Sequence, residues 1–280
     1  MSSALLAAIG VLLLVDAALR DWRPLRTKGA RSAVYLAMPY VPMVIMPLLS
    51  RLQVTIVAAV FALGALYSYA RMVGLTIYPR FFVPTVLAAA AFYVVAPVGW
   101  YALFQAMPAF AVFLVLGAAA VRGNTEAFLQ KMCLSWLAVL VYGYLWAHAA
   151  VFVETDLHAF PTGAYWIAWA LFAAKVGDVA WVAAKKLLPN AEQTQPVITA
   201  VGGALGGVAL GLLLKDPLLL WEWIVFGLIV GAALGTGSRA YNLIVADVVG
   251  PDVERPLKGT MMFGFAFSLG LAYHYVRYLS

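Results

Sequence analysis

Long apolar runs, separated by short polar stretches, follow one another along almost the whole chain. A helix needs about 20 apolar residues to cross a membrane, and ten runs reach or approach that length. They cover residues 3–19, 33–49, 53–71, 82–104, 108–121, 132–153, 164–186, 197–214, 218–238 and 260–279. The fifth run is short and could be re-entrant. The pattern predicts an all-α, polytopic membrane bundle of about ten transmembrane helices.

Composition agrees with this class of protein. Hydrophobic residues make up 65% of the chain and charged residues only 11%, whereas ordinary globular proteins carry about 25% charged residues. A single cysteine, Cys133, excludes an internal disulfide and a thiolate metal cage. The net charge of +6 is explained by membrane topology, so it is no sign of nucleic-acid binding.

Lysine and arginine are distributed unequally between the two sides of the predicted bundle. If the N-terminus lies outside, inner segments hold fourteen of these residues and outer segments hold three, while Lys175 lies within a run. Cytoplasmic loops carry the excess of Lys and Arg in membrane proteins. We therefore expect a multi-pass protein of a bacterial-type inner membrane, with its N-terminus outside and its last polar segment in the cytoplasm.

Charged side chains interrupt two of the apolar runs. Lys175 and Asp178 lie in the run 164–186 and, being three residues apart, share one helical face. Ionisable groups inside a membrane are costly and indicate a functional site by default, although a mutually neutralising pair kept for packing is the alternative. In the first run, Asp16 is expected to pair with Arg20, four residues later.

The second half of the chain contains one long stretch rich in polar residues, from Gly235 to Gly259. Both signs of charge at the mouth of a helical bundle could meet a metal ion or a phosphate in a polar cavity that faces the cytoplasm. A solvated loop between two membrane helices is the alternative. The polar and charged residues of this stretch include Ser238, Arg239, Asn242, Asp247, Asp252, Glu254, Arg255 and Lys258.

The order of these elements resembles the phosphatidate cytidylyltransferase (CDP-diacylglycerol synthase) family. In that family an aspartate precedes a basic residue by eight positions, and Asp178 and Lys186 keep this spacing. Aligned with the closing signature of the family, Asn242 falls at a serine, Asp252 at an aspartate and Lys258 at a proline. The corresponding segments are 61–75, 132–146 and 163–186, followed by a glycine-rich span at 201–211 and a last polar segment that begins at Gly237.

The resemblance implies a two-helix membrane segment at 1–52 and a cytidylyltransferase-like membrane domain at 53–280. It implies transfer of CMP from CTP to a phospholipid-type phosphate acceptor with Mg²⁺, whose ligands would be carboxylates. The catalytic candidates are Asp178, Lys186, Asp252 and Lys258. The substrate-binding candidates are Ser238, Arg239, Asn242 and Arg255, and the metal-binding candidates are Asp178, Asp247 and Asp252.

Much of the closing signature is replaced in this chain. The Lys-Arg pair of the family falls on Val245 and Ala246, and its final acidic motif falls in the apolar segment 261–267. A single preorganised charge is worth about 10²–10³ in rate, so these losses leave the enzyme label open.

Two alternatives to an enzyme therefore stand. One is a catalytically lapsed homologue that binds phospholipid and acts as a partner subunit or lipid-handling protein. The other is a transporter in which Lys175, Asp178 and His148 form an intramembrane relay. Small residues on the eighth and ninth runs would suit a homodimer or a partner membrane protein, and equally packing within one chain.

Overall fold

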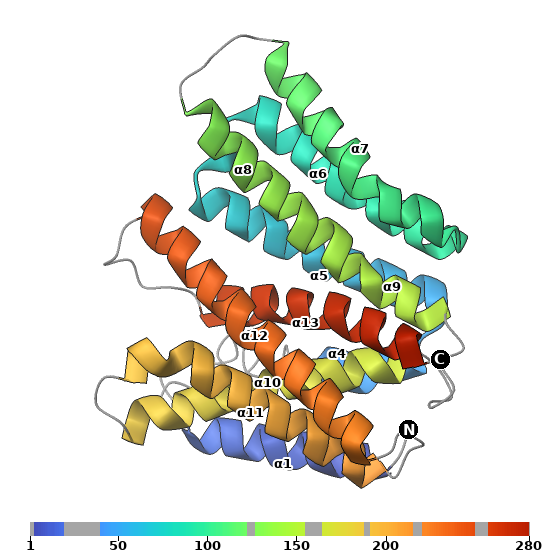
Figure 1. The fold of residues 1–280 in the computed structure, drawn as a ribbon, viewed down its shortest axis with the longest axis vertical. Helices are drawn as coiled ribbons and strands as arrows, with labels where there is room; N and C mark the ends of the chain where they lie inside the picture. Colours follow the sequence, from blue (N-terminus) through green and yellow to red (C-terminus); the bar gives the residue numbers. More distant parts are fainter. Residues whose placement is uncertain are drawn as a thin grey trace. The chain divides into compact units, whose positions relative to one another are not determined.

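The computed structural model describes residues 3–19, 40–121, 127–154, 164–187, 191–214, 220–249 and 257–279. Every regular element within these ranges is helical (Figure 1). The elements are α1 (Ser3–Leu19), α4 (Tyr40–Ile45), η1 (Met46–Leu48), α5 (Arg51–Met72), η2 (Leu75–Ile77), α6 (Pro79–Val95), η3 (Ala96–Val98), α7 (Tyr101–Ala120), α8 (Phe128–Ala138), the π-helical η4 (Val139–Leu145), α9 (Trp146–Glu154), α10 (Ala164–Leu187), α11 (Ala191–Leu214), α12 (Leu220–Val249) and α13 (Leu257–Leu279).

Seven of the described segments are long and apolar enough to cross a membrane. They are Arg51–Met72, Pro79–Val98, Tyr101–Ala120, Phe128–Val153, Ala164–Leu187, Thr194–Leu213 and Leu220–Val249. The predicted class, an all-helical multi-pass membrane protein, is confirmed. The described residues give seven such spans where the sequence predicted about ten in the whole chain, and residues 33–39 of the predicted second run lie outside the described residues.

The prediction that the fifth run is short or re-entrant is wrong. The chain breaks at Gly99, whose positive φ of 76° ends η3, and α7 then begins at Tyr101 and continues for 20 residues. Glycine adopts such a φ at no steric cost. Pro108, where the predicted run began, lies inside α7, as membrane helices tolerate.

The stretch that was expected to be a polar loop is helical over its first part. α12 continues to Val249 and has 30 residues, whereas the predicted run ended at residue 238. No glycine or proline follows Gly237 until Gly250 and Pro251, so nothing in the sequence stops the helix earlier. Ser238, Arg239, Asn242 and Asp247 are consequently helix residues.

The chain forms two compact units. Unit 1 comprises Met1–Leu49, Asp156–Arg239 and Phe263–Ser280, and unit 2 comprises Ser50–Thr155 and Ala240–Met262. The predicted division into residues 1–52 and 53–280 stays a prediction. Unit 2 is built on α5 to α9, with rings such as Phe81, Phe92 and Phe104 in its interior.

Unit 1 is built around α10, the most buried of the seven spans. α1, α4 and α11 pack against it, and small residues bring the backbones close together. A Cβ added at Gly206 of α11 would lie 2.6 Å from the Cβ of Val176 in α10, and one added at Gly231 of α12 would collide with the backbone oxygen of Ala200 in α11. The two charged residues in the middle of α10, Lys175 and Asp178, are buried in this packing.

The close contact at Gly231 generates a stability prediction. Gly231→Ala should lower the free energy of unfolding by about 1–3 kcal/mol, because the backbone carbonyl of Ala200 cannot move aside as a side chain would. Thermal and denaturant unfolding in detergent micelles would measure this. The matched control is Gly10→Ala in α1, where no atom lies within 4 Å of the added Cβ; helix propensity should raise its stability by up to about 1 kcal/mol. Equal stability of the two variants would contradict the packing described.

Candidate intramembrane charge site

α10 holds two charged side chains halfway along its length. Lys175 is the twelfth of its 24 residues, so it lies roughly 18 Å from either end of the helix. The side chains of Lys175 and Asp178 are only 4% and 7% exposed. Both charges are thus removed from water in the middle of a segment long enough to span a membrane.

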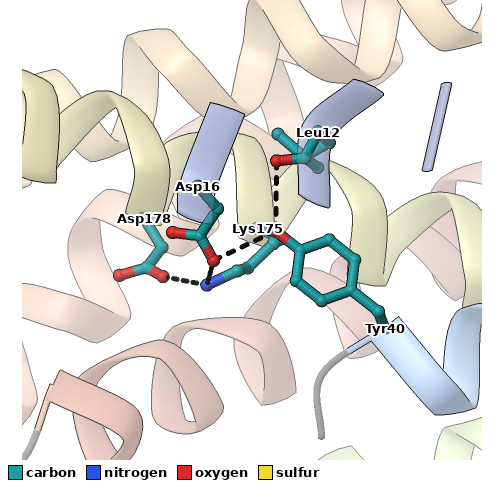
Figure 2. A network of polar contacts seen from close by, with 5 residues as sticks. All are labelled: Leu12, Asp16, Tyr40, Lys175 and Asp178. Atoms are coloured by element: carbon teal, nitrogen blue, oxygen red, sulfur yellow. Dashed lines mark hydrogen bonds and ion pairs between the residues drawn. The ribbon is translucent and has the colours of Figure 1, made fainter. Parts of the chain in front are cut away.

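A third charged group joins this pair from α1. The Nζ atom of Lys175 lies 2.6 Å from Oδ2 of Asp178 and 3.0 Å from Oδ2 of Asp16 (Figure 2). Asp16 is 0% exposed. One ammonium group therefore lies between two buried carboxylates, and it connects helices α1 and α10.

Tyr40, the first residue of α4, completes the cluster. Its hydroxyl lies 3.1 Å from Oδ2 of Asp16 and 3.4 Å from the backbone oxygen of Leu12. Nζ of Lys175 lies 5.6 Å from the centroid of the Tyr40 ring, within the range of a cation–π interaction. We call Asp16, Tyr40, Lys175 and Asp178 the charge site.

The predicted pairing of Lys175 with Asp178 is observed. The pairing of Asp16 with Arg20 stays a prediction, because Arg20 lies outside the described residues; the structure shows a contact of Asp16 with Lys175. Sequence spacing within one helix could not reveal this contact, because α1 and α10 are far apart in the chain. The available signal was the presence of a lone acid in an otherwise apolar run.

The electrostatics of the charge site are unusual. When Asp16, Lys175 and Asp178 are ionised, two of these side chains carry a negative charge and one carries a positive charge. Removing each ion from water costs several kcal/mol, which attraction and hydrogen bonds must offset.

The other predicted residue of α10, Lys186, is exposed near the end of the helix. Eight residues separate it from Asp178, so the helix holds the two about 12 Å apart along its axis. The family-like spacing thus places one residue in the interior and the other at the surface.

The remaining predicted site residues are divided among different environments. Ser238 and Asn242 are buried in α12, whereas Arg239 and Asp247 are exposed. Asp252, Arg255 and the side chain of Lys258 lie outside the described residues. Asp178 belongs to unit 1 and Asp247 to unit 2, so their joint role as metal ligands stays a prediction. Among the described residues, no group of three or more His, Cys, Asp or Glu is placed to hold a metal ion.

His148, the third member of the predicted relay, belongs to unit 2. It is buried, its Nδ1 atom lies 2.9 Å from the backbone oxygen of Tyr144, and its ring packs edge-on against Phe104. These contacts are those of a packed, hydrogen-bonded histidine of a protein core.

Comparison with known proteins adds no relative. No protein-family model, no curated protein and no solved structure matches this chain.

The central ammonium generates a second stability prediction. Lys175→Met leaves two buried carboxylates without their shared cation and should cost about 3–5 kcal/mol of stability at neutral pH. Removing the carboxylates as well, in the triple variant that adds Asp16→Asn and Asp178→Asn, should restore much of this loss. Unfolding in detergent micelles measures both effects. Lys185→Met, an exposed change near the end of the same helix, should stay within about 0.5 kcal/mol of the unaltered protein. A Lys175→Met protein as stable as this control would show that the ion pairs contribute nothing.

Proposed function

We propose that this protein is a proton-coupled membrane transporter whose charge site takes up and releases a proton within the membrane. The single observation that carries the proposal is the position of one ammonium, that of Lys175, between two buried carboxylates in the middle of a spanning helix. Intramembrane ionisable residues of this kind characterise proton relays in pumps and transporters.

The meeting of two carboxylates at one ammonium supports exchange of a proton. A carboxylate that binds a proton becomes neutral, and the cost of keeping it away from water then falls. Uptake of a proton by Asp16 or Asp178 thus gives the charge site two states that differ by one charge.

Protonation also changes the force between helices. Asp16 lies on α1, and the cation that attracts it lies on α10. Attraction between unit charges is several times stronger in a protein interior than in water, so neutralising a carboxylate weakens the contact between these helices. This provides a physical route from proton binding to a change of conformation.

Proton flux tests the proposal. The protein is reconstituted into liposomes that contain a pH-sensitive dye, and a potassium diffusion potential, negative inside, is imposed with valinomycin. Protons should enter liposomes with the unaltered protein, and entry should fall to the level of protein-free liposomes in Asp16→Asn and in Asp178→Asn. The matched control, Glu222→Gln at the start of α12, removes a carboxylate away from the charge site and should retain the flux.

Two outcomes would contradict the transport proposal. One is proton entry that does not exceed that of protein-free liposomes, in samples whose unfolding transition shows a folded protein. The other is equal flux in the unaltered protein and in both aspartate variants.

A second candidate function is that of a phosphatidate cytidylyltransferase-like protein, or of a lapsed homologue that binds phospholipid and serves a partner membrane protein. The resemblance of the chain in its element order supports it, and so does the burial of two predicted substrate-binding residues, Ser238 and Asn242, in an apolar helix. The bias of Lys and Arg supports a bacterial-type inner membrane, with the N-terminus outside and the last polar segment in the cytoplasm.

Release of pyrophosphate from CTP tests the second candidate. The purified protein is incubated with CTP, phosphatidate and Mg²⁺, beside an Asp252→Asn variant. Release that disappears in the variant would support a divergent cytidylyltransferase. If a folded sample that retains phospholipid releases no pyrophosphate, this would contradict enzymatic activity and favour the lapsed homologue.

A further inference from the structure

We infer that ordered water is bound inside unit 2, at the hydroxyl groups of Tyr69 in α5 and Ser135 in α8. We call these two hydroxyls the water site. The inference does not rest on the proposed function, because both residues belong to unit 2 whereas the charge site belongs to unit 1. It gives unit 2 a polar binding site of its own, whose ligand is water.

Both hydroxyls of the water site are buried and lack a hydrogen bond. Tyr69 is 2% exposed and Ser135 is 0% exposed. Neither Oη of Tyr69 nor Oγ of Ser135 has a hydrogen-bond partner among the described residues. A buried hydroxyl without a hydrogen bond is costly, and lipid offers no partner that could lower the cost. Since buried polar groups are nearly always paired with protein or with ordered water, water is the partner that we assign.

Other buried hydroxyls of unit 2 donate to backbone oxygens. Thr85 donates to the carbonyl oxygen of Phe81, four residues earlier, at a distance of 2.6 Å. The hydroxyl of Tyr93 donates to the carbonyl oxygen of Tyr142, also at 2.6 Å. The apolar helices of this unit can therefore satisfy a hydroxyl internally, and the water site departs from that arrangement.

The oxygen of Tyr69 is held in its place by the ring that carries it. This ring packs against the ring of Tyr142, with the centroids 5.8 Å apart. Because the phenol oxygen lies on the axis of the ring, turning the ring does not bring the oxygen to a new partner. A ligand must therefore come to this hydroxyl.

Further polar groups lie near Tyr69. Tyr241 interacts electrostatically with Tyr69 and with Tyr142. The hydroxyl of Tyr241 lies 3.5 Å from Sδ of Met72, which is a weak acceptor. A buried water molecule typically makes about three hydrogen bonds, and these phenols offer it partners besides Tyr69.

The water site lies beside an unusual helical turn. Ser135 comes four residues before Val139, the first residue of the π-helix η4, and Tyr142, which packs against Tyr69, lies within η4. π-helical turns are rare and occur frequently at functional sites. The position of both hydroxyls next to η4 therefore favours a binding site over a fault in packing.

Radiolytic labelling of the purified, full-length protein in detergent tests the part of Tyr69 without any variant. A short X-ray pulse converts water into hydroxyl radicals, which oxidise the side chains next to it, and mass spectrometry locates the oxidised residues. Tyr69 should be oxidised several times faster than Tyr93. Tyr93 is the matched control, because it is a buried tyrosine of the same unit whose hydroxyl already has a backbone partner.

The part of Ser135 is tested with a thiol, since a serine side chain is hardly oxidised. Ser135→Cys and Ala138→Cys are compared in a Cys133→Ala background, which removes the exposed native cysteine. Both positions are 0% exposed in α8, and position 135 is the one that carries a polar group in the native chain. The thiol at position 135 should be oxidised several times faster than the thiol at position 138.

Thermal unfolding gives an answer that does not depend on radical chemistry. If water binds to Tyr69, Tyr69→Phe loses a hydrogen bond and should lower the midpoint of unfolding, as Tyr93→Phe should. If the hydroxyl of Tyr69 has no partner at all, its removal relieves a cost and the midpoint should rise.

Three results would overturn the inference: oxidation of Tyr69 no faster than that of Tyr93, oxidation of the thiol at position 135 no faster than that of the thiol at position 138, or a Tyr69→Phe protein whose midpoint equals or exceeds that of the unaltered protein. None of these measurements depends on proton flux, so their outcome is independent of the transport proposal.

Discussion

The attraction of one ammonium for two carboxylates connects α1 and α10 in the interior of unit 1. Lys175, Asp16 and Asp178 are all buried, so none of the three can be hydrated as an isolated ion. Each depends on the others, because a buried charge without a partner is far more costly than the pair. The dependence also has a topological effect: Asp16 comes near the end of the first helix, and its contact with Lys175 attaches that helix to one in the second half of the chain.

Close packing of helices sets the environment of the charge site. The backbones of α10 and α11 approach each other where glycines face larger residues, as at Gly206 and Val176. Such approach needs residues without bulky side chains, since lipid provides no hydrophobic force that would press helices together. Packing on several sides turns α10 away from lipid, and this allows charged groups in the middle of a spanning helix.

The sequence predicted the helices better than it predicted the site. Spans such as Ala164–Leu187 follow from apolar length alone, since a membrane helix must satisfy its backbone hydrogen bonds internally. The end of α12 was misjudged because polar residues such as Arg239 and Asn242 were taken as a loop, although only Gly250 and Pro251 stop the helix. The contact of Asp16 with Lys175 depends on how distant helices pack, which no spacing within a helix can reveal.

The position of Lys175 halfway along α10 has an electrical consequence. A charge that moves across a whole membrane gains or loses about 2.3 kcal/mol per 100 mV. A proton that enters from one side and stops at mid-membrane depth crosses roughly half of that potential difference, or about 1 kcal/mol per 100 mV. Occupancy of the charge site should therefore depend on the membrane voltage as well as on pH. The depth of Lys175 would thus couple the proposed binding of a proton to the voltage across the membrane.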